Sequence, residues 1–280
     1  MEFALNTAAN DAQRDSIRDR AIDFTEVRSI AFTNVRKERS GTSKAKPWSI
    51  SNFSLSYSGS VANKTNPIVA KDELKTQQGA IDYNFSLPAK YIEPFKKSVT
   101  SPLLKFIGEL NFNPLPNSFA VRNSLSRKAS TRTYRFADPR YSTWEDRKFS
   151  WIRDYTLNWD LTRSLKLNFT AKNDATVDEI TFNPLRQAYV NPLTDQEVEA
   201  SQRGRFLRDN LTDFGRTKDY RHNFTASYQL PLRLIPMMDF ITVRTQYTAS
   251  FNWAAGSLKT IDSLGSVITN TQSVSISGEV

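Results

Sequence analysis

Apolar and polar residues alternate along much of the chain. In the segment 149–161 most odd positions carry aromatic or aliphatic side chains, and most even positions carry Ser, Thr, Asn or Asp. The alternation resumes in 165–172, after the short link 162–164. Because successive side chains of a strand point to opposite faces, this period of two predicts a hairpin of two strands, each with an apolar face and a polar face.

The same alternation recurs elsewhere and predicts about nine strands in all. They are 27–35, 48–58, 78–87, 117–127, 149–161, 165–172, 219–230, 240–254 and 267–280. In 48–58 the apolar phase shifts by one residue near Ser51 and Asn52, which we interpret as a β-bulge. Strands of roughly 9 to 14 residues exceed the ~5 to 6 residues usual in soluble sheets and match the ~9 to 11 residues of a bilayer-crossing strand.

The links between these strands differ in length. Long links follow residues 58, 127, 173 and 254, whereas the links 162–164 and 231–239 are short. Outer-membrane barrels have long external loops and short periplasmic turns, so this alternation favours a membrane barrel. The fold that we predict is an all-β, antiparallel, up-and-down transmembrane β-barrel segment with short helical inserts. Its odd number of long strands leaves it open at both edges.

Two segments near the N-terminal half depart from the strand pattern. Residues 7–22 contain neither Gly nor Pro and predict a polar, weakly amphipathic helix. The segment 88–116 contains several prolines, which exclude a continuous central strand, and a short helix that Ser101 can cap and Pro102 begin. We predict a periplasmic insert, whose apolar stripe contacts either the lower edge of the barrel or an accessory subunit or plug. The stripe consists of Leu103, Phe106, Ile107 and Leu110.

The segment 174–218 predicts an external loop that contains a helix. Thr194 and Glu197 have the spacing of a capping box, and Leu207 and Leu211 share one helical face. Gly215 is placed to end the helix. The prediction therefore divides the chain into one barrel section, a periplasmic insert at 88–116 and an external loop at 174–218.

In a membrane barrel, the alternation assigns each strand residue to the lumen or to lipid. On the polar phase we predict as lumen-facing Asn158, Asp160, Lys166, Asn168, Arg221, Asn223, Arg244 and Gln246. On the apolar phase we predict as lipid-facing Leu157, Trp159, Leu167, Phe169, Phe224, Tyr228, Tyr247 and Phe251. Arg153 falls on the apolar phase, where a lipid-facing charge at mid-depth costs about 2 to 4 kcal/mol, so we expect it near the external rim or beside a local bulge.

The composition argues against most enzyme chemistry. The chain has no cysteine and a single histidine, His222, which excludes disulfides, thiolate metal sites and multi-histidine sites. Neighbouring carboxylates occur at 72–73, 145–146 and 178–179, but adjacent strand residues face opposite ways, and we interpret these residues as solvated loop side chains. No glycine-rich nucleotide-binding motif occurs. We expect no enzymatic activity, no metal and no cofactor, and we place His222 at the rim of a strand.

The net charge of +9 and a pI near 9.6 allow attraction to nucleic acid, anionic headgroups or acidic partners. The basic residues are spread over strands and loops, which argues against nucleic acid. Aromatic residues make up 12% of the chain and suit either the lipid-facing side of a barrel or the core of a soluble sheet. The alternative to the membrane barrel is therefore a soluble β-sandwich module that binds glycans or other ligands. No apolar run is long enough for a transmembrane helix.

Several strings, in this order, resemble the SprA/Sov family. They are FTEVR at 24–28, KPWSISNF at 46–53, PAKYIEPF at 88–95, NFNPLP at 111–116, WDLTRSLKL at 159–167 and DFGRT at 213–217. Members of this family are very large outer-membrane β-barrels of the type IX secretion system of Bacteroidota. Through them, folded cargo, including gliding adhesins, leaves the periplasm for the cell surface.

The resemblance implies a location in the cell outer membrane and a role in a protein-conducting channel. It implies secreted cargo, other type IX secretion subunits, a plug and outer-membrane lipid as partners. Because family members are several times longer, it also implies that this chain is a fragment. The strings at 128–147 and 174–193 do not resemble the family, and we expect variable external loops there.

Overall fold

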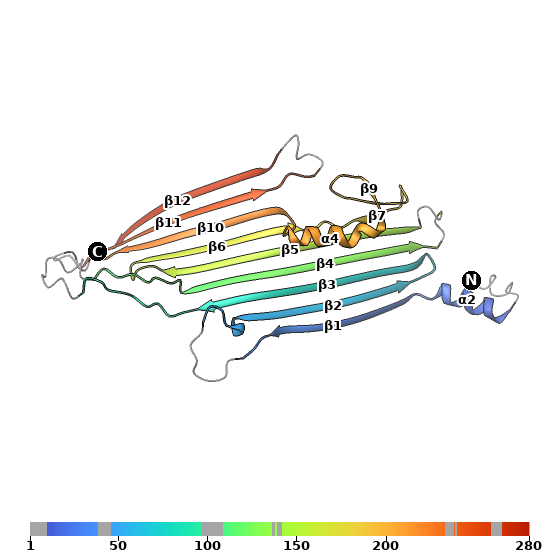
Figure 1. Cartoon of the computed structure of the whole chain (residues 1–280), viewed down its shortest axis with the longest axis horizontal. Coiled ribbons are helices and arrows are strands. Elements are labelled where there is room, and N and C mark those ends of the chain that lie inside the picture. The colour runs from blue at the N-terminus through green and yellow to red at the C-terminus, as the bar shows by residue number, and fades with distance from the viewer. Residues whose placement is uncertain are drawn as a thin grey trace.

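The computed structural model describes residues 10–38, 46–96, 109–135, 138, 142–232, 238, 240–258 and 265–279. Over these residues the chain forms a nine-stranded antiparallel sheet in which each strand pairs with the next in sequence (Figure 1). The strands are β1 (Phe24–Val35), β2 (Phe53–Thr65), β3 (Val69–Ser86), β4 (Ser118–Tyr134), β5 (Thr143–Asp160), β6 (Leu165–Thr176), β10 (Arg216–Leu230), β11 (Thr242–Ala254) and β12 (Val267–Glu279). The predicted antiparallel, up-and-down order is confirmed, and the sheet is open, since β1 and β12 each have one neighbour.

The links lie alternately at the two ends of the sheet. At one end, here called the α4 end, lie the links 66–68, 135–142, 177–215 and 255–266. At the opposite end, here called the far end, lie the links 36–52, 87–117, 161–164 and 231–241. Both ends therefore carry long and short links, and the expected contrast between long external and short periplasmic links does not hold across the whole sheet.

The long links expected after residues 58 and 127 are wrong because β2 to β5 are longer than predicted. β3 and β5 each contain 18 residues. β2 and β3 are joined by a tight turn in which the Asn66 side-chain oxygen accepts hydrogen bonds from the backbone N–H groups of Ile68 and Val69. The additional strand residues at this end carry large apolar side chains only at scattered positions, such as Val61, Leu74 and Trp144, so an apolar period of two could not reveal them.

The predicted bulge near Ser51 is also wrong. Residues Ile50–Asn52 form the 3₁₀ turn η1, and β2 begins only at Phe53. The Asn52 side chain is buried and donates hydrogen bonds to the carbonyl oxygens of Lys46 and Pro47, which folds the preceding segment back on itself. This local turn accounts for the shift in the apolar phase.

The line of strand ends runs obliquely across the sheet. A row of directly opposite residues starts at Val35, the last residue of β1 at the far end, and passes through Ile81 and Arg153. It then reaches Ile268, next to the first residue of β12 at the α4 end. From each strand to the next, the strand ends are therefore displaced along the strand direction. With ~3.3 Å per residue and ~4.8 Å between strands, this displacement corresponds to a strand tilt of roughly 40° from an axis perpendicular to the line that joins the strand ends.

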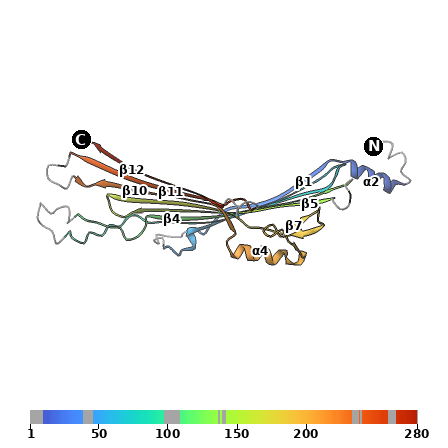
Figure 2. The same ribbon diagram turned by 90° about the horizontal axis from the view of Figure 1, so that it is seen from above.

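The segment 177–215, here called the excursion, joins β6 to β10 and folds onto one face of the sheet (Figure 2). It contains β7 (Thr181–Asn183), β8 (Ala188–Val190) and β9 (Glu197–Val198), which form a small antiparallel sheet, then η4 (Ala200–Gln202) and the helix α4 (Arg203–Thr212). The predicted loop helix therefore exists, but the capping box is wrong, because Glu197 lies in β9.

The helix α4 ends at Thr212, and the predicted stop, Gly215, follows three residues later as the last residue of the excursion. The Gly215 N–H donates a hydrogen bond to the Asn210 carbonyl at 2.9 Å, and the φ of Gly215 is +69°. A Cβ at this position would lie 3.0 Å from the Thr176 carbonyl oxygen. Glycine is therefore required here both for the left-handed backbone and for the close approach to β6.

The helix α2 (Asp11–Ala21) precedes β1 and confirms the predicted N-terminal helix over these residues. Asn10 caps it by accepting a hydrogen bond from the Gln13 N–H at 2.8 Å. No helix among the described residues is long and apolar enough to cross a membrane. The predicted helix within 88–116, including Leu103, Phe106 and Ile107, lies outside the described residues, whereas Leu110 is described and exposed.

The sheet has very little core. Apart from Phe85, the buried hydrophobic residues among those described lie beneath the excursion, within it, or beside it on β5 and β6; they are Phe149, Ala171, Ala175, Val177, Ile180 and Val190. The accessible surface is 19414 Å², whereas a compact monomer of 31.9 kDa would have roughly 12,000 Å². The sheet is therefore mostly a single layer with both faces open.

Candidate functional site: the two faces of the sheet

The register separates the predicted polar and apolar residues completely. Asn158 lies opposite Asn168, and Asp160 lies opposite Lys166, on the face that we call the polar face. Through β10 and β11 the same face continues with Arg221, Asn223, Arg244 and Gln246. The amide groups of Asn158 and Asn168 are hydrogen-bonded to each other, and Asn158 also donates to the Ser118 hydroxyl at 2.8 Å.

The predicted apolar residues lie on the opposite face, which we call the aromatic face. Leu157, Phe169 and Phe224 form one row of directly opposite residues, and Trp159 lies opposite Leu167. The remaining members of the set, Tyr228, Tyr247 and Phe251, share this face on β10 and β11. That the polar face meets a lumen and the aromatic face meets lipid stays a prediction, since the register shows only the separation.

Large side chains cover the aromatic face, and over most of its area none of the described residues lies above them. Leu55 is 51% exposed, Ile81 48%, Phe53 43% and Val274 64%. The aromatic rings on this face contact one another within the sheet, as in the edge-on pair of Phe53 and Tyr83 with centroids 5.0 Å apart. A soluble monomer rarely exposes an apolar patch of more than a few hundred Å², so this face requires an apolar environment or a partner.

His222 lies inside this aromatic surface, not at the rim of a strand as predicted. Its ring stacks on Phe251 at 5.2 Å and lies 5.7 Å from Phe169 and 5.6 Å from Tyr220. The strand β10 begins at Arg216, several residues earlier than the predicted start, because the charged residues that follow Gly215 hide the alternation. The earlier start moves His222 away from the strand end.

Arg153 is covered by the excursion. Its guanidinium lies over the rings of Trp151 and Phe214, at 5.1 and 5.5 Å, and donates hydrogen bonds to the Asn173 side chain and to the Phe214 carbonyl, both at 3.2 Å. Arg153 therefore lies neither at a rim nor beside a bulge, because it is inside β5 in an unbroken register and the end of the excursion covers its charge. Asn123, on the neighbouring strand, accepts a hydrogen bond from the Trp151 indole.

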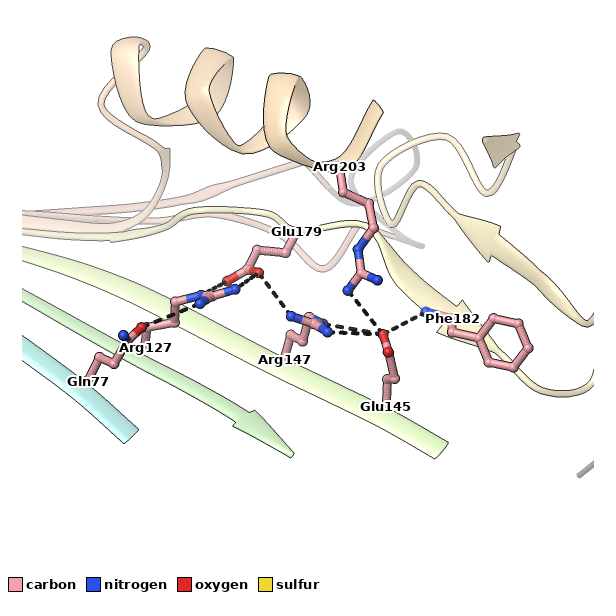
Figure 3. A network of polar contacts seen from close by, with 7 residues as sticks. All are labelled: Gln77, Arg127, Glu145, Arg147, Glu179, Phe182 and Arg203. Carbon is pink, nitrogen blue, oxygen red and sulfur yellow. Dashed lines mark hydrogen bonds and ion pairs between the residues drawn. The ribbon is translucent and has the colours of Figure 1, made fainter. Parts of the chain in front are cut away.

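A network of ion pairs fixes the excursion to the aromatic face at the α4 end (Figure 3). Glu179, at the start of the excursion, accepts two hydrogen bonds from Arg127 of β4, at 2.6 and 2.7 Å, and lies 3.8 Å from Arg147 of β5. Glu145 of β5 accepts from Arg147 at 3.3 Å and from Arg203 of α4 at 3.2 Å. The two carboxylates therefore join strands β4 and β5 to both ends of the excursion.

Backbone and ring contacts extend this network. The Phe182 N–H of β7 donates to Glu145 at 3.4 Å, and Arg203 also lies 4.7 Å above the Tyr189 ring of β8. Close by, Asp178 accepts two hydrogen bonds from Arg216, at 2.9 and 3.0 Å. Only 7% of the side chains of Asp178 and Glu179 is exposed, so these charges are buried and paired.

Asp178, Glu179 and Glu145 are the residues that the sequence interpretation missed. They were interpreted as solvated loop carboxylates, and the structure shows that this is wrong. The signal that could have indicated the network is weak: acidic doublets lie near strand ends and several arginines occupy strand positions. The arginines that donate to Glu179 and Asp178 are 52 and 38 residues away in sequence. Only the strand register brings them together.

The link 87–117 at the far end is held against the turn between β5 and β6. The Trp159 indole N–H donates to the Asn113 carbonyl at 2.8 Å, and the Arg163 N–H donates to the Asn111 side chain at 2.9 Å. Glu93 forms ion pairs with Lys96 at 2.7 Å and Arg163 at 2.6 Å. Lys96 and then Arg163 hold the pKa of the Glu93 carboxyl below its usual value, because both cations stabilise its charged form.

Among the described residues, no group of three or more Asp, Glu or His side chains is placed to hold a metal ion. The acidic residues of the network instead accept from arginines, which leaves no free carboxylate there for acid–base chemistry. What the arrangement does offer is a large surface with two chemically opposite faces and a folded element bound to one of them. Comparisons of this chain with protein-family models and with characterised proteins find no match.

Proposed function

We propose that this sheet is part of the wall of a transmembrane β-barrel in the cell outer membrane. The observation that carries the proposal is the separation of the predicted apolar and polar strand residues onto opposite faces of a single-layer sheet, whose aromatic face is widely exposed. In a bilayer the aromatic face would contact lipid and the polar face would line a lumen. Both faces then have the environment that their side chains require.

The tilt of the strands supports this proposal independently. The stagger of the strand ends corresponds to a tilt of roughly 40°, within the ~35 to 45° of transmembrane barrels. The open edges at β1 and β12 would pair with further strands of the same wall.

We further propose that this wall belongs to the protein-conducting channel of the type IX secretion system, through which folded cargo leaves the cell. The resemblance of several sequence strings to the SprA/Sov family supports this assignment. The polar face is suited to this role, because a surface that binds water does not retain a folded protein, whose exterior is also polar. In this proposal the wall is a passive conduit without enzymatic activity, and the energy and direction of transport come from partner subunits.

The link 87–117 is proposed as the periplasmic contact element, and the excursion as an external loop. Near the far end, an apolar pocket is lined by Leu87, Pro88, Ile92, Pro114 and Leu115, with Lys90 at its side. Because the turn 161–164 holds this link in place, the pocket is presented at a fixed position beyond the strand ends. Replacing Phe106 and Ile107 by Ser in the full-length protein should leave insertion intact and reduce secretion or co-purification of a partner. Normal secretion with unchanged partners would reject contact with a subunit or plug.

The alternative, a soluble β-sandwich that binds glycans through its exposed aromatic residues, has less support. A sandwich needs a second sheet over the aromatic face, and the small sheet of β7, β8 and β9 covers only the part near β5 among the described residues. Exposed rings alone would favour a glycan site. The contiguous extent of the apolar surface over all nine strands favours lipid instead.

The absence of cysteine makes a direct test of the two faces practicable. We suggest single substitutions at neighbouring positions, Asn223→Cys on the polar face and Phe224→Cys on the aromatic face, in the full-length protein in native membranes. A hydrophilic, membrane-impermeant maleimide should label the first and not the second, while a lipid-soluble probe should show the reverse. Equal labelling of both positions without detergent would reject the membrane-wall proposal, and a folded, monodisperse protein in plain buffer would favour the soluble alternative.

A further inference from the structure

The polar face carries cations and anions in nearly equal number, although the whole chain has a net charge of +9. By register, its cations on the strands are Lys64, Arg122, Lys128, Arg132, Lys148, Lys166, Lys172, Arg221 and Arg244. Its anions on the strands are Asp72, Asp82, Asp146, Asp154, Asp160, Asp174, Asp219 and Glu279. The positive excess of the chain therefore resides mostly on other surfaces.

The two signs are interleaved on this face. Asp82 lies opposite Arg122, Arg122 lies opposite Asp154, and Asp154 lies opposite Lys172, so charge alternates across β3 to β6. Like charges also face each other on this face, in the pairs Lys172 with Arg221, Asp174 with Asp219, and Lys128 with Lys148. The first two of these pairs have opposite signs and lie next to each other, so they offset each other. Nearer the α4 end, Arg132 donates to Asp72 at 2.7 Å. Opposite charges on neighbouring strands cancel each other's field within a few ångströms, which is shorter than the ~8 Å Debye length at physiological salt.

Hydroxyl groups occupy much of the remaining polar face. β2 places Ser54, Ser56, Ser58 and Ser60 on this face. β12 places Thr269, Thr271, Ser273, Ser275 and Ser277 there. On this face β2 offers no large apolar side chain, and β12 offers only Val267, at its α4 end. Neither strand carries a cluster of one charge there. Apolar patches and clusters of one charge are the two features that would hold a passing protein surface.

We propose that the polar face is indifferent to the net charge of the cargo, so that hydrated proteins of either sign pass along it. This inference rests on the proposed function and adds to it a property of the substrates: their selection is not made by the charge of this wall. Electrostatic selection needs a cleft lined by one sign of charge, because only then does a potential of several kT extend to the cargo. The interleaved pairs of the polar face exclude such a potential here.

The test compares cargo of opposite charge with walls of altered charge. Two surface variants of one secreted cargo, shifted equally to negative and positive net charge, are expressed with the full-length translocon. The wall variants replace Ser124, Thr170, Thr225 and Thr248, which all lie on the polar face, by Asp in one wall and by Lys in the other. A third wall with Asn at the same positions is the matched control. Secreted and retained cargo are measured for each pair.

With the native wall and the Asn wall, we expect the two cargo variants to be secreted equally, within about twofold. The Asp wall should change the ratio of the two variants by about tenfold and the Lys wall should change it in the opposite direction, because each now presents one sign of charge. Should the fourfold variants not reach the membrane, the milder pair Lys166→Gln with Arg244→Gln, and Asp154→Asn with Asp160→Asn, provides the same comparison.

Two results would overturn the inference, and they differ in what they say of the proposed function. If the native wall secretes one cargo variant about tenfold less than the other, and the cysteine labelling described above holds, the face is selective for charge and only this inference fails. If no wall variant alters the ratio of the two cargoes, this face does not meet cargo at all, and both the inference and the conducting role are rejected.

Discussion

The aromatic face has a covered part and an uncovered part, and the two use different residues. Beneath the excursion, on β5 and β6, the sheet carries small residues such as Ala171 and Ala175, together with charges that are paired or stacked. Away from it, on β2, β3 and β12, the face carries large side chains such as Leu55, Ile81 and Ile276 that are at least 48% exposed.

The difference shows what each part faces. Where protein covers the sheet, small side chains allow close approach and every buried charge needs a partner of opposite sign. Where none of the described residues covers it, large apolar side chains are exposed, and an apolar environment or a partner would have to cover them. The chain thus distinguishes, on one continuous face, the part that meets its own excursion from the part that we propose meets lipid.

The largest effect is expected where a buried charge of the covered part loses its partner. Glu179→Gln leaves Arg127 half-buried without a counter-charge and leaves Arg147 with Glu145 alone, which should weaken attachment of the excursion by about 3 kcal/mol. Limited proteolysis and hydrogen exchange over 177–215 should show faster opening, while the ladder of β2 and β3 stays protected. The exposed pair of Arg132 and Asp72 offers the control, since Asp72→Asn should change little. Equal protection of the excursion in all three proteins would contradict the importance of the network.

The second prediction concerns the uncovered part. Trp159→Asp should reduce the fraction of membrane-inserted protein, whereas Asn158→Asp on the adjacent position should not, because the first places a charge in lipid near an interface at a cost of about 2 kcal/mol and the second places it in water. Heat-modifiable mobility after membrane extraction measures the inserted fraction. Trp159→Phe is the control: it removes the hydrogen bond to Asn113 without adding a charge, so it separates the effects of these two changes. An identical loss for both Asp variants would show that the assignment of the faces is wrong.

The third prediction addresses the border between the covered and uncovered parts. Arg153→Met removes the hydrogen bonds to Asn173 and to the Phe214 carbonyl and should loosen the end of α4 by about 1 kcal/mol. Hydrogen exchange at residues 212–216 should increase, with β11 unaffected. Arg153→Lys keeps the charge but not the planar contact with Trp151 and Phe214, so it should give an intermediate result. If hydrogen exchange at these residues slowed in Arg153→Met, the arginine would destabilise the end of α4 and would not hold it in place.

The smallest effect is expected at the far end and depends on pH. Because the pKa of Glu93 is lowered in the folded protein by Lys96 and Arg163, its contribution is complete above the ordinary carboxyl pKa and is lost as the pH falls through the lowered value. The protection factors of amides at 91–96 and 161–164, which are corrected for the intrinsic pH dependence of exchange, should therefore fall below about pH 4 relative to neutral pH. Glu93→Gln should remove this pH dependence. A pH response that persists in Glu93→Gln would assign it to another group.

The sequence predicted the strands well where one face is apolar and poorly where neither is. The predicted strands 149–161 and 240–254 agree with the parts of β5 and β11 in which an apolar residue occupies every second position. The same period is absent from residues 69–77 and 128–134, where β3 and β4 carry polar side chains on both faces, so these parts were interpreted as loops. The burial of Asp178 and Glu179 could not be predicted either, since the sequence does not say which arginine lies opposite.

The sequence by itself determined the antiparallel order, the number of long strands and the face to which each strand residue belongs, because a period of two leaves only two directions for a side chain. Tertiary structure alone decided how far each strand extends, how the strand ends are staggered, and onto which face the excursion folds. These features depend on the register of each ladder and on charges far apart in sequence, such as Arg127 and Glu179, and neither leaves a periodic signal in the chain.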